Sequence, residues 1–104
     1  MIVVEVDPGI CGLMSKITVN SNDEKTAAVD ITSDCPAVKA MGEDLKEVDS
    51  RKGCLSRIGG SPVYIAAGKR CHAACPVPMA IIKGIEAACG LAIPKDVTIK
   101  IYKE

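Results

Sequence analysis

Three short segments in the first third of the chain alternate apolar and polar residues, and this pattern restricts the fold more than any other feature. Apolar residues occupy every second position within 2–6, 17–19 and 27–31. A period of two places them on one face of a strand, as in an antiparallel sheet that is covered on one side. The polar stretch 21–24 is short enough to be a hairpin connection. We therefore expect three strands that run up, down and up.

Helical spacing follows these segments. Apolar residues recur every three or four positions over 36–48, which predicts a helix. A short segment over about 51–58 ends at two glycines, and the serine and proline at 61–62 are typical of the start of a helix running toward residue 70. A last helix is expected to open at Pro76 and to stop at Gly90. Each helix has an apolar stripe with which it can pack on a sheet.

Alternation returns at the end of the chain, where positions 97, 99 and 101 are apolar, and we expect a closing strand there. The 104 residues suffice for one compact domain, so a single α+β domain over 1–104 is predicted. The order of elements favours a two-layer sandwich. Its four-stranded, mainly antiparallel sheet would contain three N-terminal strands and one C-terminal strand, with the helices packed on one face.

Composition argues against several classes of function. The chain has 13 basic and 13 acidic residues, a formal net charge of zero and only two aromatic residues, so nucleic acid is not expected as a partner. No apolar run has the length of a membrane span, and the first seven residues lack the basic start of a signal peptide. We expect a cytoplasmic protein without a membrane partner. Association with a second copy or with another protein stays open.

The six cysteines suggest where chemistry occurs, because thiols in the cytoplasm are normally kept reduced. Cys35 and Cys75 each stand directly before a proline at the start of a predicted helix. Proline excludes the preceding residue from the helix and is itself favoured at the first helical position, which puts both cysteines at N-caps. The positive end of a helix favours a thiolate, the form that binds metals and attacks disulfides.

Further candidates surround these two cysteines. Cys11 lies in the loop after the first strand and Cys35 follows the third, so both fall at the same end of the sheet, roughly 10 Å apart by strand spacing. Cys71, His72 and Cys75 form a Cys-His-x-x-Cys cluster with the residue types of a zinc or iron–sulfur site. The other two cysteines, Cys54 and Cys89, are interpreted as packing residues of the core.

Three functions follow from this arrangement. The first is a site for zinc or an iron–sulfur cluster, formed by Cys11, Cys35 and Cys75 with Cys71 or His72. The second is thiol redox or sulfur-transfer chemistry, with Cys75 as nucleophile and Cys35 or Cys71 resolving. The third is a non-catalytic interaction module in which the cysteines are incidental. We favour the metal site, and whether the protein is an enzyme stays open.

Three resemblances accompany this interpretation. The stretch Cys75-Pro76-Val77-Pro78 resembles the Cys-Pro-x-Pro motif of small sulfur-carrier proteins, which implies a persulfide on Cys75. The region 72–101 is similar to the tail of the organic-hydroperoxide-resistance family, which implies that Cys35 and Cys75 pair. As a whole, VDPGICG, ITSDCPAVK and HAACPVPMAIIKGIEAACGLAIPKDVTIKI resemble a small uncharacterised family of cysteine-rich proteins of archaea and anaerobic bacteria.

Overall fold

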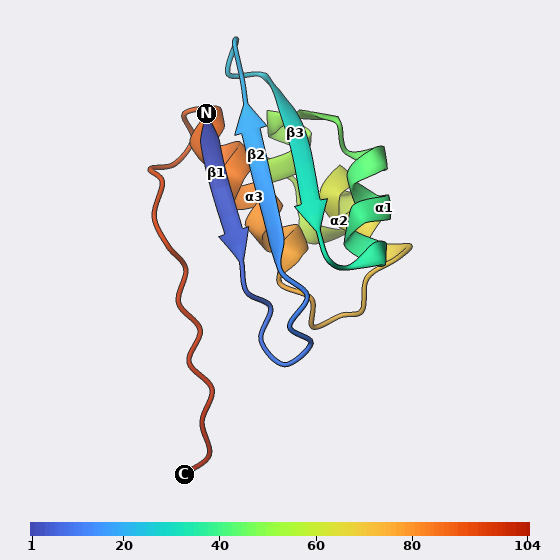
Figure 1. Cartoon of the computed structure of the whole chain (residues 1–104). Coiled ribbons are helices and arrows are strands. Elements are labelled where there is room, and N and C mark those ends of the chain that lie inside the picture. The colour runs from blue at the N-terminus through green and yellow to red at the C-terminus, as the bar shows by residue number, and fades with distance from the viewer.

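The sheet is an antiparallel meander in which each strand pairs with its neighbour in sequence (Figure 1). The computed structural model describes residues 1–104. The sheet has the order β1-β2-β3-β4, and its strands are β1 (Ile2–Val6), β2 (Ser15–Asn20), β3 (Thr26–Ser33) and β4 (Glu47–Asp49). The helices are α1 (Pro36–Asp44), a π-helical segment η1 (Arg51–Leu55), a 3₁₀ turn η2 (Ile58–Gly60), α2 (Pro62–Gly68) and α3 (Val77–Ala88).

Strand register explains why one face of the sheet is apolar. Ile17 of β2 stands opposite Val4 of β1 and Ile31 of β3, and Val19 stands opposite Ile2 and Val29. Side chains of opposite residues project from the same face, so the alternating segments align their apolar positions. Ile17 and Val19 are completely buried at the centre of this face. The expected α+β class, the three N-terminal strands and their antiparallel pairing are confirmed.

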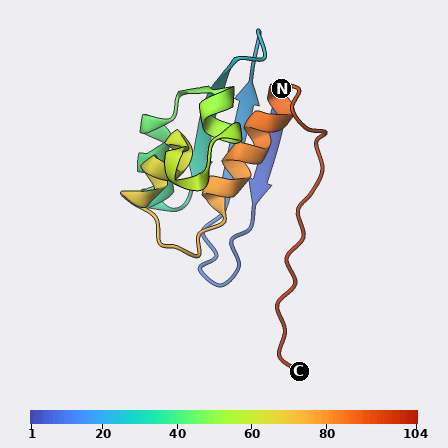
Figure 2. The same ribbon diagram turned by 180° about the vertical axis from the view of Figure 1, so that it is seen from behind.

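The helices cover that apolar face as a second layer (Figure 2). Helix α3 packs across β1 and β2, while α1 packs on β3, and α2 lies between the two helices. Ile81 and Ile85 of α3 are fully buried and belong to one core cluster of 17 residues. None of the helices combines the length and apolar character needed to cross a membrane.

Gly84 allows α3 to approach the sheet closely. A Cβ atom at this position would lie 2.9 Å from Cγ2 of Val4 and 3.1 Å from Cγ2 of Val19. Both distances are shorter than ordinary van der Waals contact between carbon atoms. The missing side chain therefore sets the spacing between the helix and the first two strands.

The prediction of a closing strand over 97–101 is wrong. Residues 91–104 form no helix or strand, and they leave the body of the molecule as an extended arm beside β1 (Figures 1 and 2). The fourth strand is β4, which comes from mid-chain and pairs with β3 at the opposite edge of the sheet. Alternation indicates that a segment can be extended and half-covered, but it does not specify a partner strand.

Strand β4 also shows that the first helix ends earlier than predicted. Val48 continues the helical spacing of 36–48, yet α1 ends at Asp44 and Val48 lies in β4 opposite Ala27. Both placements bury this valine, which is 2% exposed. Apolar spacing alone could not separate a fourth helical turn from a strand of three residues.

Candidate functional site

Three cysteines, Cys35, Cys71 and Cys75, lie close together at one end of the sheet. All three are half-buried and pack against the core cluster. Cys35 follows the end of β3, and the other two lie in the link from α2 to α3, which passes the same end of the molecule (Figures 1 and 2). The thiol of Cys71 interacts with that of Cys75 and is within electrostatic range of Cys35. None of the three forms a disulfide.

Two serine hydroxyls fix the position of Cys35 relative to the sheet. The backbone N–H of Cys35 donates to Oγ of Ser33 over 3.0 Å. Ser33 Oγ in turn lies 2.8 Å from Oγ of Ser15, directly across the β2–β3 pair. Cys35 then serves as N-cap of α1 in an extended backbone conformation, as expected, and accepts a hydrogen bond from Lys39 N–H. The thiol therefore stands at a helix start that is tied to the sheet.

Cys71 and Cys75 delimit the turn between α2 and α3. The N–H of Cys71 donates to the carbonyl of Ala67 over 2.7 Å, which continues α2 by one hydrogen bond. The N–H of Cys75 donates to the carbonyl of His72 over 3.1 Å and closes the turn. Helix α3 has Pro76 as its N-cap, so the expectation of an N-cap at Cys75 is wrong by one residue. Pro76 adopts helical backbone angles before the first residue of the helix proper.

The electrostatics of this group disfavour ionisation of Cys71. Burial raises the pKa of the Cys71 thiol, and Cys75 and then Cys35 act in the same direction. A negative charge on Cys75 opposes a second charge on Cys71, because like charges at short range disfavour double ionisation. Cys71 is therefore held as a neutral thiol beside Cys75.

The remaining predicted site residues lie outside this thiol group. Cys11 is at the same end of the sheet, in the loop between β1 and β2, but it is exposed and is not among the groups that affect Cys71. His72 is exposed in the α2–α3 turn. No set of three or more His, Cys, Asp or Glu side chains is arranged to hold a metal ion.

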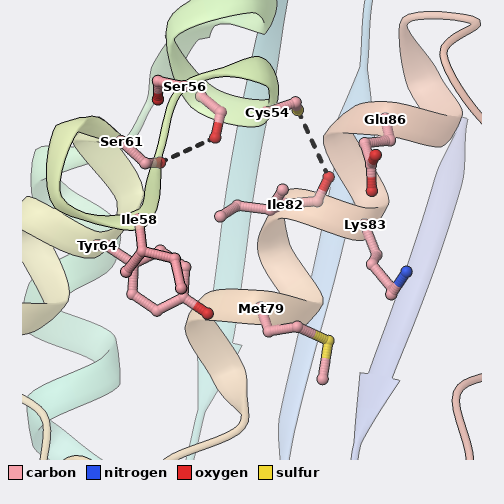
Figure 3. Close-up of a pocket in the computed structure, with 10 residues that line it drawn as sticks. Cys54, Ser56, Ile58, Ser61, Tyr64, Met79, Ile82, Lys83 and Glu86 are labelled. Carbon is pink, nitrogen blue, oxygen red and sulfur yellow. Dashed lines mark hydrogen bonds between the residues drawn. The ribbon is translucent and has the colours of Figure 1, made fainter.

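Of the other two cysteines, Cys54 lies beside a cavity of about 230 Å³ that α3 borders (Figure 3). Cys54 lines this cavity and donates from Sγ to the carbonyl of Ile82 over 3.7 Å. Cys89 is 2% exposed, in agreement with its expected place in the core. Tyr64, Met79 and Ile82 give the cavity an apolar wall, and Lys83 and Glu86 lie at its border.

The thiol of Cys54 is expected to titrate only in strongly alkaline solution. Burial raises its pKa from the ordinary 9.0 to about 11, with Glu86 and Cys89 acting in the same direction. Since the folded state keeps this proton longer than the unfolded state, the free energy of unfolding should fall as pH rises from about 9 to 11. Urea titrations of the wild type and Cys54→Ala at several pH values would measure this. An equal alkaline loss of stability in both proteins would contradict the expectation.

Part of this site could not be predicted from the sequence. The pairing of Ser15 with Ser33 can be recognised only once the register of β2 and β3 is known. The approach of the α2–α3 turn to Cys35 depends on how three helices pack on the sheet, and no spacing in the sequence reports that.

Comparison with known proteins gives a family without an assigned activity. No curated protein and no solved structure matches the chain significantly. One family model, described as a family of unknown function (DUF6951), matches residues 2–101. This match spans the strands, the helices, all six cysteines and most of the C-terminal arm. The chain therefore belongs to the DUF6951 family.

Proposed function

We propose that the protein is a cytoplasmic thiol–disulfide exchange protein in which Cys71 and Cys75 alternate between a dithiol and a disulfide. The observation that carries this proposal is the interaction of the Cys71 and Cys75 thiols in one half-exposed turn. Two neighbouring thiols can form a disulfide without a large change in the fold where the backbone brings their sulfur atoms into bonding reach. Because they lie in a turn and not inside a regular helix, the backbone between them can adjust to the bond.

The reaction transfers two electrons to an external disulfide. The Cys75 thiolate attacks one sulfur of that disulfide, whose S–S bond breaks, and the other sulfur leaves as a thiolate that takes up a proton. Cys71 then loses its proton and attacks the Cys75 sulfur in the mixed disulfide. A Cys71–Cys75 disulfide forms, and the second thiol of the oxidant is released. Protein thiols are oxidised and the external disulfide is reduced.

The neighbouring groups support this division of roles. The raised pKa of Cys71 keeps a proton on the resolving thiol while Cys75 makes the first attack. Cys35 is a third thiol within electrostatic range and could compete for the mixed disulfide. Of the two resolving residues considered from the sequence, Cys71 is favoured, because it lies in the same turn as Cys75 and Cys75 has a larger effect on its pKa than Cys35 has.

Oxidation of the protein by a glutathione redox buffer tests the proposal. A Cys11→Ser background removes the exposed thiol, which could otherwise link two molecules. After equilibration and acid quenching, free thiols are alkylated and disulfides are mapped by peptide mass spectrometry. We expect a Cys71–Cys75 disulfide, with Cys54 and Cys89 recovered as free thiols. Cys54→Ser in the same background serves as control and should leave the midpoint potential unchanged.

Other results would replace the proposal. Oxidation that pairs Cys35 with Cys75 would assign a different resolving residue, and a persulfide on Cys75 would indicate sulfur transfer. One equivalent of zinc or iron in anaerobically purified protein, released by alkylation of the thiols, would support the metal site favoured by the sequence. If the thiols stay reduced at every potential, the non-catalytic interaction module is the function that remains.

A further inference from the structure

The C-terminal arm, residues 91–104, has the pattern of a strand but no partner. Every residue of the arm is exposed. Val97, Ile99 and Ile101 are 50%, 66% and 92% exposed, although they alternate with polar residues as in a half-covered strand. Both views show the arm running past the body of the molecule without joining the sheet (Figures 1 and 2). Solvent exposure of this apolar series costs free energy that a partner strand would remove.

The sheet offers a matching edge at β1. This strand pairs with β2 on one side only, so its other side presents backbone N–H and C=O groups without partners. β1 has no proline, bulge or covering helix along this edge. Ile2 and Val4 pack against the core cluster but are only half-buried. The core is therefore incomplete along β1.

The arm is complementary to this edge in pattern and in charge. Three inward residues of β1 are apolar at every second position, and so are positions 97, 99 and 101 of the arm. The arm carries Lys100 between two apolar residues, and β1 carries Glu5 between two apolar residues. In a parallel pairing that places Ile99 opposite Val4, Lys100 is opposite Glu5 on the outer face, where opposite charges stabilise a strand pair.

A second copy of the chain can provide this strand, because the arm of one copy is free of its own sheet. The arm projects beyond the end of its own body, and the longest dimension of the molecule is 45 Å against 27 and 24 Å for the others. Two copies facing each other by their β1 edges can each receive the other's arm. Such an exchange is self-complementary and closes as a two-fold dimer.

We propose that the protein forms an arm-exchanged dimer in which residues 96–102 of each chain add a fifth strand to the sheet of the other, next to β1. Backbone hydrogen bonds supply the pairing, and Val97, Ile99 and Ile101 fill the uncovered part of the core beside Ile2 and Val4. The arm is then an interaction surface for a second copy, independent of the thiol group at the end of the sheet.

Sedimentation equilibrium of the full-length chain under reducing conditions tests this, with Ile99→Asp and Thr98→Asp as a matched pair. Both variants add the same charge at adjacent positions, but only residue 99 faces the core in the proposed strand. We expect the wild type and Thr98→Asp to be dimers. Ile99→Asp should weaken dimerisation on the order of 100-fold, because each dimer contains two altered arms and each loses a buried apolar side chain.

Hydrogen exchange of the arm amides completes the test. Slow exchange over 97–101 in the wild type and fast exchange in Ile99→Asp are expected. A monomer with protected arm amides would show that the arm pairs with its own β1 and would overturn the proposal. A monomer with unprotected amides, or a dimer that Ile99→Asp leaves intact, would overturn it as well.

Discussion

Replacement of Cys75 by serine is expected to lower the rate of exchange with an external disulfide by on the order of 100-fold or more, because a serine hydroxyl is not ionised near neutral pH. Cys71→Ser should behave differently. Its first attack proceeds, but the mixed disulfide on Cys75 should persist longer, because the favoured resolving thiol is gone and only Cys35 remains in the group. Stopped-flow reduction of a chromogenic aromatic disulfide, followed by mass spectrometry of the trapped adduct, would measure both effects. The Cys11→Ser background again removes the competing exposed thiol.

Cys54→Ser is the matched control for these variants. It removes a half-buried thiol of similar exposure, on the side of the cavity and away from the thiol group. We expect the same exchange rate as in the background protein. If Cys75→Ser reacts as fast as Cys54→Ser, Cys75 is not the attacking residue. A stable adduct found on Cys35 would identify the N-cap residue of α1 as the nucleophile instead.

Gly84→Val is expected to lower the free energy of unfolding by about 2 kcal/mol, through overpacking between α3 and the sheet. The first added atom already meets Val4 and Val19 at 2.9 and 3.1 Å, and both of these side chains lie on β-strands that cannot yield independently. The γ-methyl groups extend the conflict. Urea denaturation monitored by far-ultraviolet circular dichroism would detect a lower midpoint at an unchanged slope.

Gly68→Ala provides the corresponding control. Gly68 ends α2, and a Cβ atom there meets no other atom within 4 Å. Alanine should therefore stabilise the protein by up to about 0.5 kcal/mol, since it reduces the freedom of the unfolded chain without a new clash. Equal effects of the two substitutions, in either direction, would show that helix propensity and not the spacing of α3 from the sheet controls stability.

The part of the fold that sequence could predict is the part set by local pattern. β1, β2 and β3 follow from period two, and the up-down-up order correctly placed Cys11 and Cys35 at the same end of the sheet. The prolines at 36 and 62 marked the starts of α1 and α2. These features depend on short stretches of chain, in which a few residues determine the conformation.

The rest depended on interactions between distant segments. The position of Val48 fits the apolar spacing of a helix and of a strand, and its pairing with β3 places it in a strand. The arm has the alternating pattern of a strand but does not join its own sheet. Likewise, Cys71 comes within electrostatic range of Cys35 because α2 and α3 pack on the same face as α1, a relation that no spacing encodes. The predicted roles of Cys11 and His72 as metal ligands stay predictions.

The sequential order of the strands also has a consequence for how the molecule acquires its structure. Each strand can pair with the one made just before it, so the sheet can assemble while synthesis proceeds. The contacts of α3 with β1 and β2, in contrast, join the two ends of the domain. The apolar face around Ile17 and Val19 therefore stays bare until residues 77–88 have been made. During that interval, the nascent sheet is most exposed to aggregation and to cellular chaperones.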